Sequence, residues 1–241
     1  MNTLKKILFL AIIIVFTFNA CKKDAEFNTF LQIEEQVDGA SFSMGNAYLN
    51  SLNQQYKFET LLFYLSNIAL ISEDGTEQPL VDVVLHNYTD PNSLKFNIPE
   101  GKYTAIKFGL GLDPDLNLTD PTTVAEDSPF HSDRGMYWVW ATMYKFVKFE
   151  GRASADSNVS DLTDAFLYHL GTNPYYQEIT LPRSIEIDDK EETKVKIVLN
   201  IDQIFDNATT PIDIINENQT QTGDNPTLAQ KVKKNLVAAF E

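Results

Sequence analysis

Three histidines are the side chains in this sequence whose type favours metal binding. His86 ends one apolar segment, His131 lies at the end of a long polar stretch, and His169 lies on another apolar segment just before a turn. Imidazole nitrogens bind soft copper ions well. Histidines at strand ends could converge at one mouth of a β-sandwich. The alternative is three ordinary histidines, one of them a hydrogen-bonded residue of the core.

Two tryptophans, Trp138 and Trp140, stand two residues apart in an aromatic segment. On a β-strand this spacing places both rings on one face. Composition favours core packing for such a pair, because each ring buries a large apolar area. The competing interpretation is an aromatic surface strand that binds a glycan or a protein.

Motifs for catalysis or for other cofactors are missing. The sequence has no GxSxG elbow, no HExxH and no CxxC, and residues 109–111 lack the third glycine and the helix of a phosphate-binding loop. Asp113, Asp115 and Asp120 resemble a loose calcium loop, but their spacing fails the EF-hand pattern and favours a solvated acidic loop. We therefore expect no enzyme, since a hydrolase has no motif behind it.

The single cysteine, Cys21, follows a segment typical of a secretory signal. Two lysines precede an apolar run over residues 7–18, and Ala20 stands just before the cysteine. The run is too short to cross a bilayer as a helix, which takes about 20 residues. We predict a signal peptide over residues 1–20 and lipid attachment at Cys21, with plain signal cleavage as the alternative.

The expected location is the outer membrane, with the protein facing the periplasm or the cell surface. Residues 21–27 then form a tether, which resembles the charged sequence after the lipidated cysteine in Bacteroidetes lipoproteins. The membrane, reached through the lipid anchor, is the expected partner. The net charge of −15 argues against nucleic acid as a partner, because no basic stripe exists to neutralise phosphates.

Most of the elements that would position these residues are predicted to be β-strands. Alternating apolar and polar residues predict strands at residues 27–36, 104–110 and 193–200, among others. Residues 136–149 are predicted to form one aromatic strand that carries both tryptophans. A long polar stretch over residues 113–134 has little periodicity, and loops of this length in a compact domain are usually functional or disordered.

The C-terminal segment differs from the rest. Asn225 and Pro226 supply a cap and a first-turn proline, and apolar residues then recur every four positions as far as Phe240. This pattern predicts an amphipathic helix over residues 226–240. The expected fold is all-β: an antiparallel β-sandwich with long loops and a C-terminal α-helix, as a single domain over residues 28–241.

Four groups of residues stand out, in this order along the chain: Phe63-Tyr64-Leu65-Ser66-Asn67-Ile68; Pro99-Glu100-Gly101-Lys102-Tyr103 with Phe108-Gly109-Leu110-Gly111-Leu112-Asp113 and Asn117; Gly135-Met136-Tyr137-Trp138-Val139-Trp140 with Tyr144 and Lys148-Phe149-Glu150-Gly151; and Tyr168-His169-Leu170-Gly171. Together they resemble the motifs of a known family, the MbnP family. The resemblance runs from about Phe30 to Phe240. The Trp-x-Trp and His-Leu-Gly motifs are fairly specific when they occur together.

The resemblance implies a periplasmic or surface β-sandwich protein that binds copper. In the family, copper is bound by histidines and by a kynurenine, which a partner dihaem enzyme of the cytochrome c peroxidase type makes from a tryptophan. Opening the indole ring gives an aromatic amine and a ketone, so an apolar residue becomes a possible ligand. On this basis Trp138 or Trp140 is the modified residue and His169 is the first histidine ligand, with His131 and His86 as weaker candidates.

The sequence departs from the family's pattern just before the predicted C-terminal helix. Many relatives carry a histidine there, where this chain has Thr222-Gly223-Asp224-Asn225. The loop before Met136 also lacks the G-A-x-x-G-A-L run of many Bacteroidetes relatives. The missing histidine leaves two readings: the chain keeps the fold without the metal site, or it uses His131 in compensation.

Two functional hypotheses follow from the sequence. The leading one is a lipid-anchored protein that captures or handles copper without catalysis of its own. The other is a surface lipoprotein that binds a glycan or a protein through the aromatic strand and the long loop, with no metal.

Overall fold

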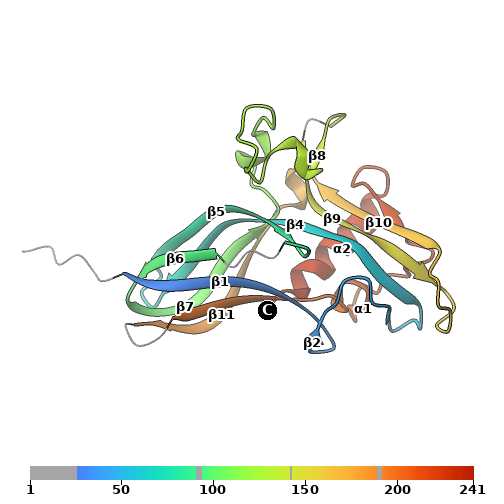
Figure 1. Ribbon diagram of the computed structural model, residues 1–241, viewed down its shortest axis with the longest axis horizontal. Coiled ribbons are helices and arrows are strands. Elements are labelled where there is room, and N and C mark those ends of the chain that lie inside the picture. Colours follow the sequence, from blue (N-terminus) through green and yellow to red (C-terminus); the bar gives the residue numbers. More distant parts are fainter. Residues whose placement is uncertain (1–25, 91–93, 142, 189–191) are drawn as a thin grey trace, which may run out of the picture.

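The structure is a computed structural model that describes residues 26–241, except residues 91–93, 142 and 189–191. The predicted signal peptide and Cys21 lie outside the described residues. Two β-sheets and two helices build most of the fold (Figure 1). Within the described ranges, no helix has the length and apolar character needed to cross a bilayer.

The smaller sheet is built around β1 (Glu26–Val37). On one side β12 (Thr193–Asn200) runs parallel to β1. On the other side β6 (Leu94–Pro99) and β2 (Ala40–Ser41) pair with β1 in antiparallel fashion. Alternate residues of β1 and β12 are apolar and buried, as expected for strands with one face against a core.

The larger sheet is built around the long strand β4 (Gln55–Ser72). On one side of its C-terminal half lies β5 (Glu77–Asn87). On the other side, β9 (Met143–Ser154) pairs with the first half of β4 and β7 (Gly101–Leu110) with the second half. The strands β7 and β9 therefore lie end to end along one side of β4.

Further strands extend both halves of the larger sheet. Beyond β7 lies β11 (Gln177–Ile187), and beyond β9 lie β10 (Asp164–Gly171) and β13 (Gln219–Thr220). The short strands β3 (Tyr48–Leu49) and β8 (Tyr137–Trp138) pair with β4 and β9. The β10–β13 pairing is parallel, as is β1–β12, so both sheets are mixed.

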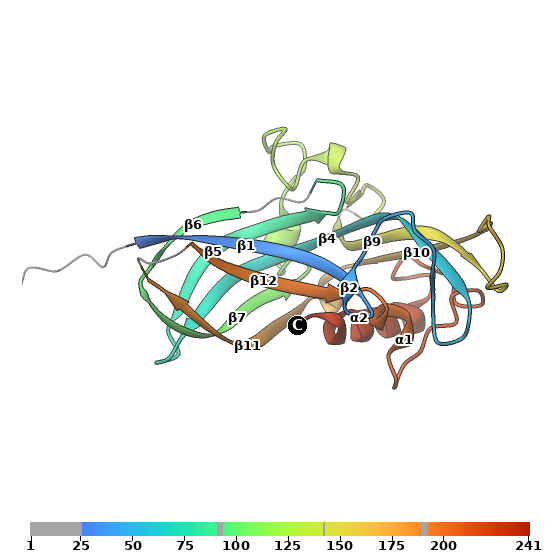
Figure 2. The same cartoon turned by 60° about the horizontal axis from the view of Figure 1, so that its bottom comes forward.

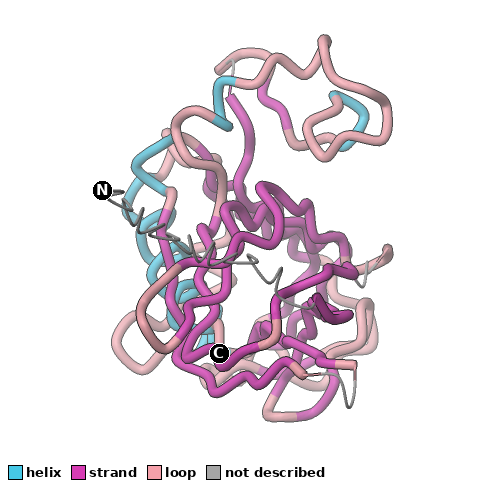
Figure 3. The backbone as a smooth tube through the Cα atoms, turned by 90° about the vertical axis from the view of Figure 1, so that its left-hand side faces the viewer, coloured by secondary structure: helices cyan, strands magenta, loops and turns pink. Residues whose placement is uncertain are grey.

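Residues 111–141, called the excursion below, leave the larger sheet at the junction between β7 and β9. They contain η1 (Leu116–Leu118), η2 (Ser132–Arg134) and β8, and they project from the outer face of the sheet (Figures 1 and 3). The hydroxyl of Tyr64 on β4 donates to the carbonyl of Pro129 at 2.7 Å, which ties the excursion to the sheet. A long loop predicted over most of this stretch is thus present, and it is held against the strands.

The helices cover the part of the larger sheet that the smaller sheet leaves open (Figure 2). They are α1 (Gln203–Asp206) and α2 (Pro226–Ala239), with the short η3 (Asn173–Tyr175) after β10. The side chain of Asn225 caps α2 by accepting from the Leu228 N–H at 3.1 Å. Aromatic rings fill the space between the layers: Phe58, Phe149, Phe166, Tyr168 and Phe205 contact one another there.

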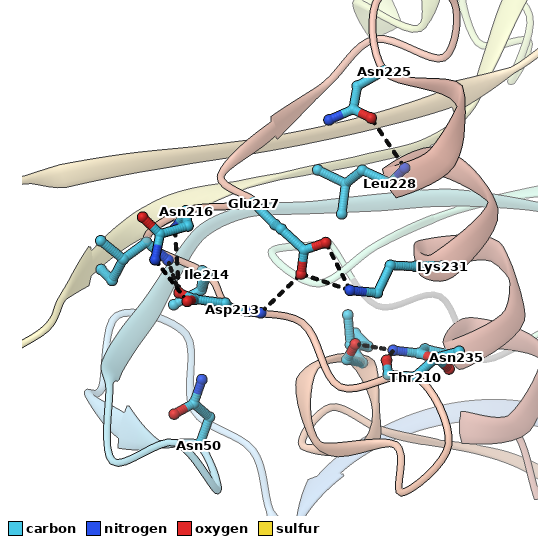
Figure 4. A network of polar contacts seen from close by, with 12 residues as sticks. Asn50, Thr210, Asp213, Ile214, Asn216, Glu217, Asn225, Leu228, Lys231 and Asn235 are labelled. Atoms are coloured by element: carbon cyan, nitrogen blue, oxygen red, sulfur yellow. Dashed lines mark hydrogen bonds and ion pairs between the residues drawn. The ribbon is translucent and has the colours of Figure 1, made fainter.

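A polar network fixes α2 to the segment before β13 (Figure 4). Glu217 accepts from the Lys231 ammonium at 2.6 Å and from the Asp213 N–H at 3.1 Å. The buried amide of Asn235 donates to the carbonyls of Ile204 and Thr210, both at 2.8 Å. The carboxylates of this network are therefore satisfied by protein donors.

The predicted fold is confirmed: the chain forms a β-sandwich with one long C-terminal helix. The prediction of a single aromatic strand over residues 136–149 was wrong. This segment forms β8, a turn and β9, and the turn is closed by a hydrogen bond from the Ala141 N–H to the Trp138 carbonyl at 3.2 Å. Alternating aromatic residues do not reveal the reversal, because a tight hairpin preserves the apolar pattern on both strands.

Candidate metal-binding site

The three histidines lie on three different elements, and the convergence that the sequence allowed is not found among the described residues. His86 is on β5, His131 precedes η2 and His169 is on β10. Across the ranges that the structure covers, no three or more His, Cys, Asp or Glu side chains are grouped to hold a metal ion. His86 and His169 also point to opposite faces of the larger sheet, because their strand neighbours alternate between the core and the outer face.

His86 lies in the core between the two sheets. Its Nε2 atom contacts the carboxylate of Glu35 on β1, and the two side chains are 4% and 7% exposed. Its ring lies 4.8 Å from the ring of Phe63. This pair joins the two layers of the sandwich, as in the alternative interpretation of a hydrogen-bonded core histidine.

His131 has a local role in the excursion. Its Nδ1 atom accepts a weak hydrogen bond from the Asp133 N–H at 3.4 Å and so caps η2. The Asp133 carboxylate lies 3.7 Å from the same nitrogen. These contacts give His131 no second histidine or cysteine partner in the part of the chain that is described.

His169 has a geometry suited to ligand binding. Its side chain is buried on the outer face of β10, and Nε2 lies 2.8 Å from the Glu150 carboxylate on β9. Its Nδ1 atom is buried and has no hydrogen-bond partner. Burial lowers the pKa of His169, against the opposing effect of Glu150. A neutral ring that donates from Nε2 keeps its free lone pair on Nδ1, which is the arrangement of a histidine prepared for a metal ion.

Trp138 packs at the same end of β10 as His169. A side-chain carbon built on Gly171 would meet the indole ring at 2.3 Å, so the ring occupies the space that this glycine leaves free. Gly171 and His169 are two residues apart and share the outer face of the strand. The indole Nε1 is buried without a partner, and the Lys145 ammonium lies 5.7 Å from the ring centroid. Two unpartnered nitrogens, one from His169 and one from Trp138, thus lie on this face.

Trp140 differs from Trp138 in its environment. It lies in the turn after β8 and is 71% exposed, whereas Trp138 is 4% exposed. The two rings remain in contact, with centroids 5.3 Å apart and planes inclined by 42°. The prediction that both rings share one strand face therefore fails, because the chain turns between them.

Two strained threonines flank the end of β10. Thr172 and Thr222 have φ values of 69° and 67°, a region that β-branched residues rarely adopt. The Thr222 hydroxyl accepts from the Gly171 N–H at 3.0 Å and donates to the His169 carbonyl at 3.1 Å. Backbone strain of this kind is often found at functional sites. The sequence singles out Thr222 only as part of the segment where a family histidine is missing, and the structure places Thr222 in contact with His169.

Charged side chains of β9 lie around His169, which is on β10. Glu150 also lies 3.8 Å from the Lys148 ammonium, and Lys145 donates to the Gly135 carbonyl at 2.9 Å. Burial lowers the pKa of Lys145. The arrangement offers one imidazole lone pair and, at the same end of β10, a buried indole, which fits a soft ion with few ligands better than an ion that needs four.

The loop aspartates that resembled a calcium loop are used internally. Asp113 accepts from the main-chain N–H groups of Asp115 and Leu116 and from the side chain of Asn67. Asp120 accepts from Thr122. These contacts fix turns of the excursion and agree with the interpretation of a solvated acidic loop.

Comparisons with known proteins agree with this architecture. Residues 28–226 match the family model described as MbnP. No curated protein matches the chain. The solved structure of MbnP from Methylosinus trichosporium is similar in fold, with a TM-score of 0.52 and 15% sequence identity, and the match covers 75% of this chain and 78% of that chain. Because the family model covers most of the sequence, the chain belongs to the MbnP family.

Proposed function

We propose that this protein is an extracytoplasmic, lipid-anchored protein that binds copper and serves in its capture or handling, without catalysis of its own. Membership of the MbnP family supports a role connected with copper. The observation that carries the proposal is the buried, unpartnered Nδ1 of His169, whose Nε2 is held by Glu150. Metal-binding histidines commonly donate their second nitrogen to a carboxylate in this way.

We assign the second ligand to a kynurenine made from Trp138. The indole of Trp138 is buried at the same end of β10 as His169, whereas Trp140 is exposed on a turn. Ring opening replaces the apolar indole by an aromatic amine and a ketone, which supply nitrogen and oxygen donors. Oxidation cleaves the indole C2–C3 bond, and hydrolysis of the N-formyl product releases C2 as formate and leaves the amine. The oxidant, peroxide or dioxygen, is expected to be activated by a dihaem enzyme of the cytochrome c peroxidase type acting on this chain.

The proposed site has few ligands. His131 would have to give up its contacts at η2 to replace the histidine that family members carry before the C-terminal helix. We therefore assign copper to His169 and the modified Trp138, a ligand number that suits soft Cu(I).

The test of this function combines a mass measurement with a binding measurement. The protein is purified from the membranes of its own host, and the peptide over residues 135–145 is mapped by mass spectrometry. We expect one tryptophan, Trp138, to have exchanged one carbon for one oxygen. Two unmodified tryptophans, in cells that express the partner oxidase, would contradict the kynurenine assignment.

Cu(I) affinity is then measured by competition with a chromogenic chelator. His169→Ala should weaken binding by at least about tenfold, the loss that removal of even a supporting hydrogen bond causes at metal sites. His131→Ala is the matched control and should leave the affinity unchanged. Equal affinities of the His169→Ala variant and the natural protein would remove His169 from the site.

A second function is favoured by the exposure of Trp140 and Val139, which are 71% and 81% exposed at the tip of the β8–β9 turn. An exposed indole is a stacking surface for a sugar ring or a protein side chain. Binding on a glycan array that is lost in Trp140→Ala would favour this role. Persistence of that binding in Trp140→Ala would exclude the turn as its site.

A further inference from the structure

A cleft of about 390 Å³ lies at the free side of β5, on the face of the larger sheet that carries the excursion. Its apolar wall consists of Leu62, Val81, Val83, Leu85, Leu94 and Pro129. The cleft lies apart from His169, because β10, which carries His169, is on the opposite side of β4 from β5. Figure 1 shows these strands. The proposed copper site does not use it.

The strand beside this cleft has an unpaired edge. In the described part of the chain, β5 pairs with β4 alone. Along an antiparallel strand, the main-chain groups of successive residues point alternately toward the partner strand and away from it. The Tyr88 N–H donates to the Leu61 carbonyl, so Tyr88 is a residue whose groups point toward β4. Counting back from Tyr88, Leu85 and Val83 occupy the positions whose N–H and C=O groups point away from β4. These groups face the cleft side of the strand.

One observation agrees with this alternation. Tyr64 lies opposite Leu85, and its carbonyl accepts from the Gly111 N–H on the far side of β4. The free edge is therefore available from Val81 to Leu85.

The same residues supply both the open backbone and the apolar wall. Val81, Val83 and Leu85 direct their side chains into the cleft and their main-chain groups to the edge. The stretch from Val81 to Leu85 is about 13 Å long at the usual rise per strand residue. An extended peptide can thus form main-chain hydrogen bonds with β5 and place alternate side chains against the wall, which is the geometry of β-strand addition.

The rim of the cleft is acidic. Asp90, Asp127 and Asp133 line it together with one cation, Arg134. The Arg134 guanidinium donates to the carbonyls of Ser128 and Glu126, so it is engaged within the excursion. A second copy of this chain would bring the same acids and a net charge of −15 to the contact, which disfavours pairing of two β5 strands.

We propose that the free edge of β5 binds an extended segment of a partner protein in which apolar residues alternate with lysine or arginine. Main-chain pairing with Val83 and Leu85 supplies the alignment, and the apolar side chains fill the cleft. The basic side chains meet the aspartates of the rim. This interaction surface is independent of copper and of the state of Trp138.

The probe for this surface is a fluorescent nonapeptide in which lysine and valine alternate, added to the mature protein at low salt. Two control peptides are matched to it. In one, glutamate replaces lysine; in the other, the backbone nitrogens that would face β5 are methylated, so charge and apolarity stay but strand pairing is blocked. We expect the lysine peptide to bind and both controls to bind at least tenfold more weakly. Equal binding of the methylated peptide would overturn strand addition.

Variants and amide exchange locate the bound peptide. The double change Asp127→Asn with Asp133→Asn should weaken binding about fivefold, given the modest worth of exposed charge pairs. Asp161→Asn with Asp164→Asn removes the same charge at the β9–β10 connection and should have no effect. Hydrogen exchange of the Val83 and Leu85 amides should slow when the peptide binds. No binding, no slowing, or slowing that follows self-association of the protein would each refute the proposal.

Discussion

The buried pair of His86 and Glu35 offers the sharpest test of the structure, because it joins the two sheets. Both side chains are less than one-tenth exposed, and each is the other's polar partner across the layers. His86→Leu leaves the Glu35 carboxylate buried without a partner. Leaving a buried polar group without its partner costs about 1–3 kcal/mol, and more when the group is charged. This is a large part of the 5–15 kcal/mol by which an ordinary domain is stable.

The two other variants complete a thermodynamic cycle. Glu35→Leu leaves an imidazole nitrogen unsatisfied, which costs about 1–3 kcal/mol. The double change His86→Leu with Glu35→Leu replaces the pair by apolar groups, and such replacements are often neutral or stabilising. We therefore expect the free energy of unfolding of the double variant to lie within about 1 kcal/mol of that of the natural protein. The two single losses added together would give a much larger decrease.

The assay is guanidinium unfolding followed by the fluorescence of the tryptophans, with Cu(I) affinity measured on the folded double variant. The affinity should be unchanged, because His86 faces the core and His169 faces the opposite side of the sheet. Additive losses in the cycle would refute the paired, buried geometry. Weaker copper binding in the double variant would return His86 to the list of ligands.

Three further predictions concern the end of β10. Glu150→Gln should weaken Cu(I) binding about 10-fold or more in chelator competition, because the carboxylate orients the His169 ring. The unfolding midpoint should stay nearly unchanged, since Glu150 is partly exposed. An unchanged Cu(I) affinity would show that Glu150 does not orient His169. Thr222→Val loses both hydrogen bonds to β10 and should lower the free energy of unfolding by about 1–3 kcal/mol, with faster exchange of the Gly171 amide. Because burial lowers the pKa of His169 in the folded state, the unfolded chain binds more protons, so stability should fall as the pH drops below about 6.5; His169→Gln should flatten that part of the pH profile, and an identical profile in the variant would contradict it.

Much of the fold was predictable from local sequence patterns. The alternation in β1, β7 and β12 and the capped repeat of α2 each depend on residues close together in the chain, so periodicity alone located them. The parallel pairing of β1 with β12 depends on contacts between the two ends of the chain, which no local pattern records. The hairpin of β8 and β9 was missed for a related reason, since the aromatic alternation continues through the turn.

The candidate site shows the same division. Residue types alone indicated which side chains are able to bind a soft metal ion, and the resemblance indicated the family. The contacts of the folded chain were needed to show that His86 pairs with Glu35 inside the core, that the His169 Nδ1 atom has no hydrogen-bond partner, and that Trp138 is buried whereas Trp140 faces solvent. The physical reason is that burial, hydrogen-bond partners and the face of a sheet arise from neighbours distant in sequence, whereas residue type and spacing are local.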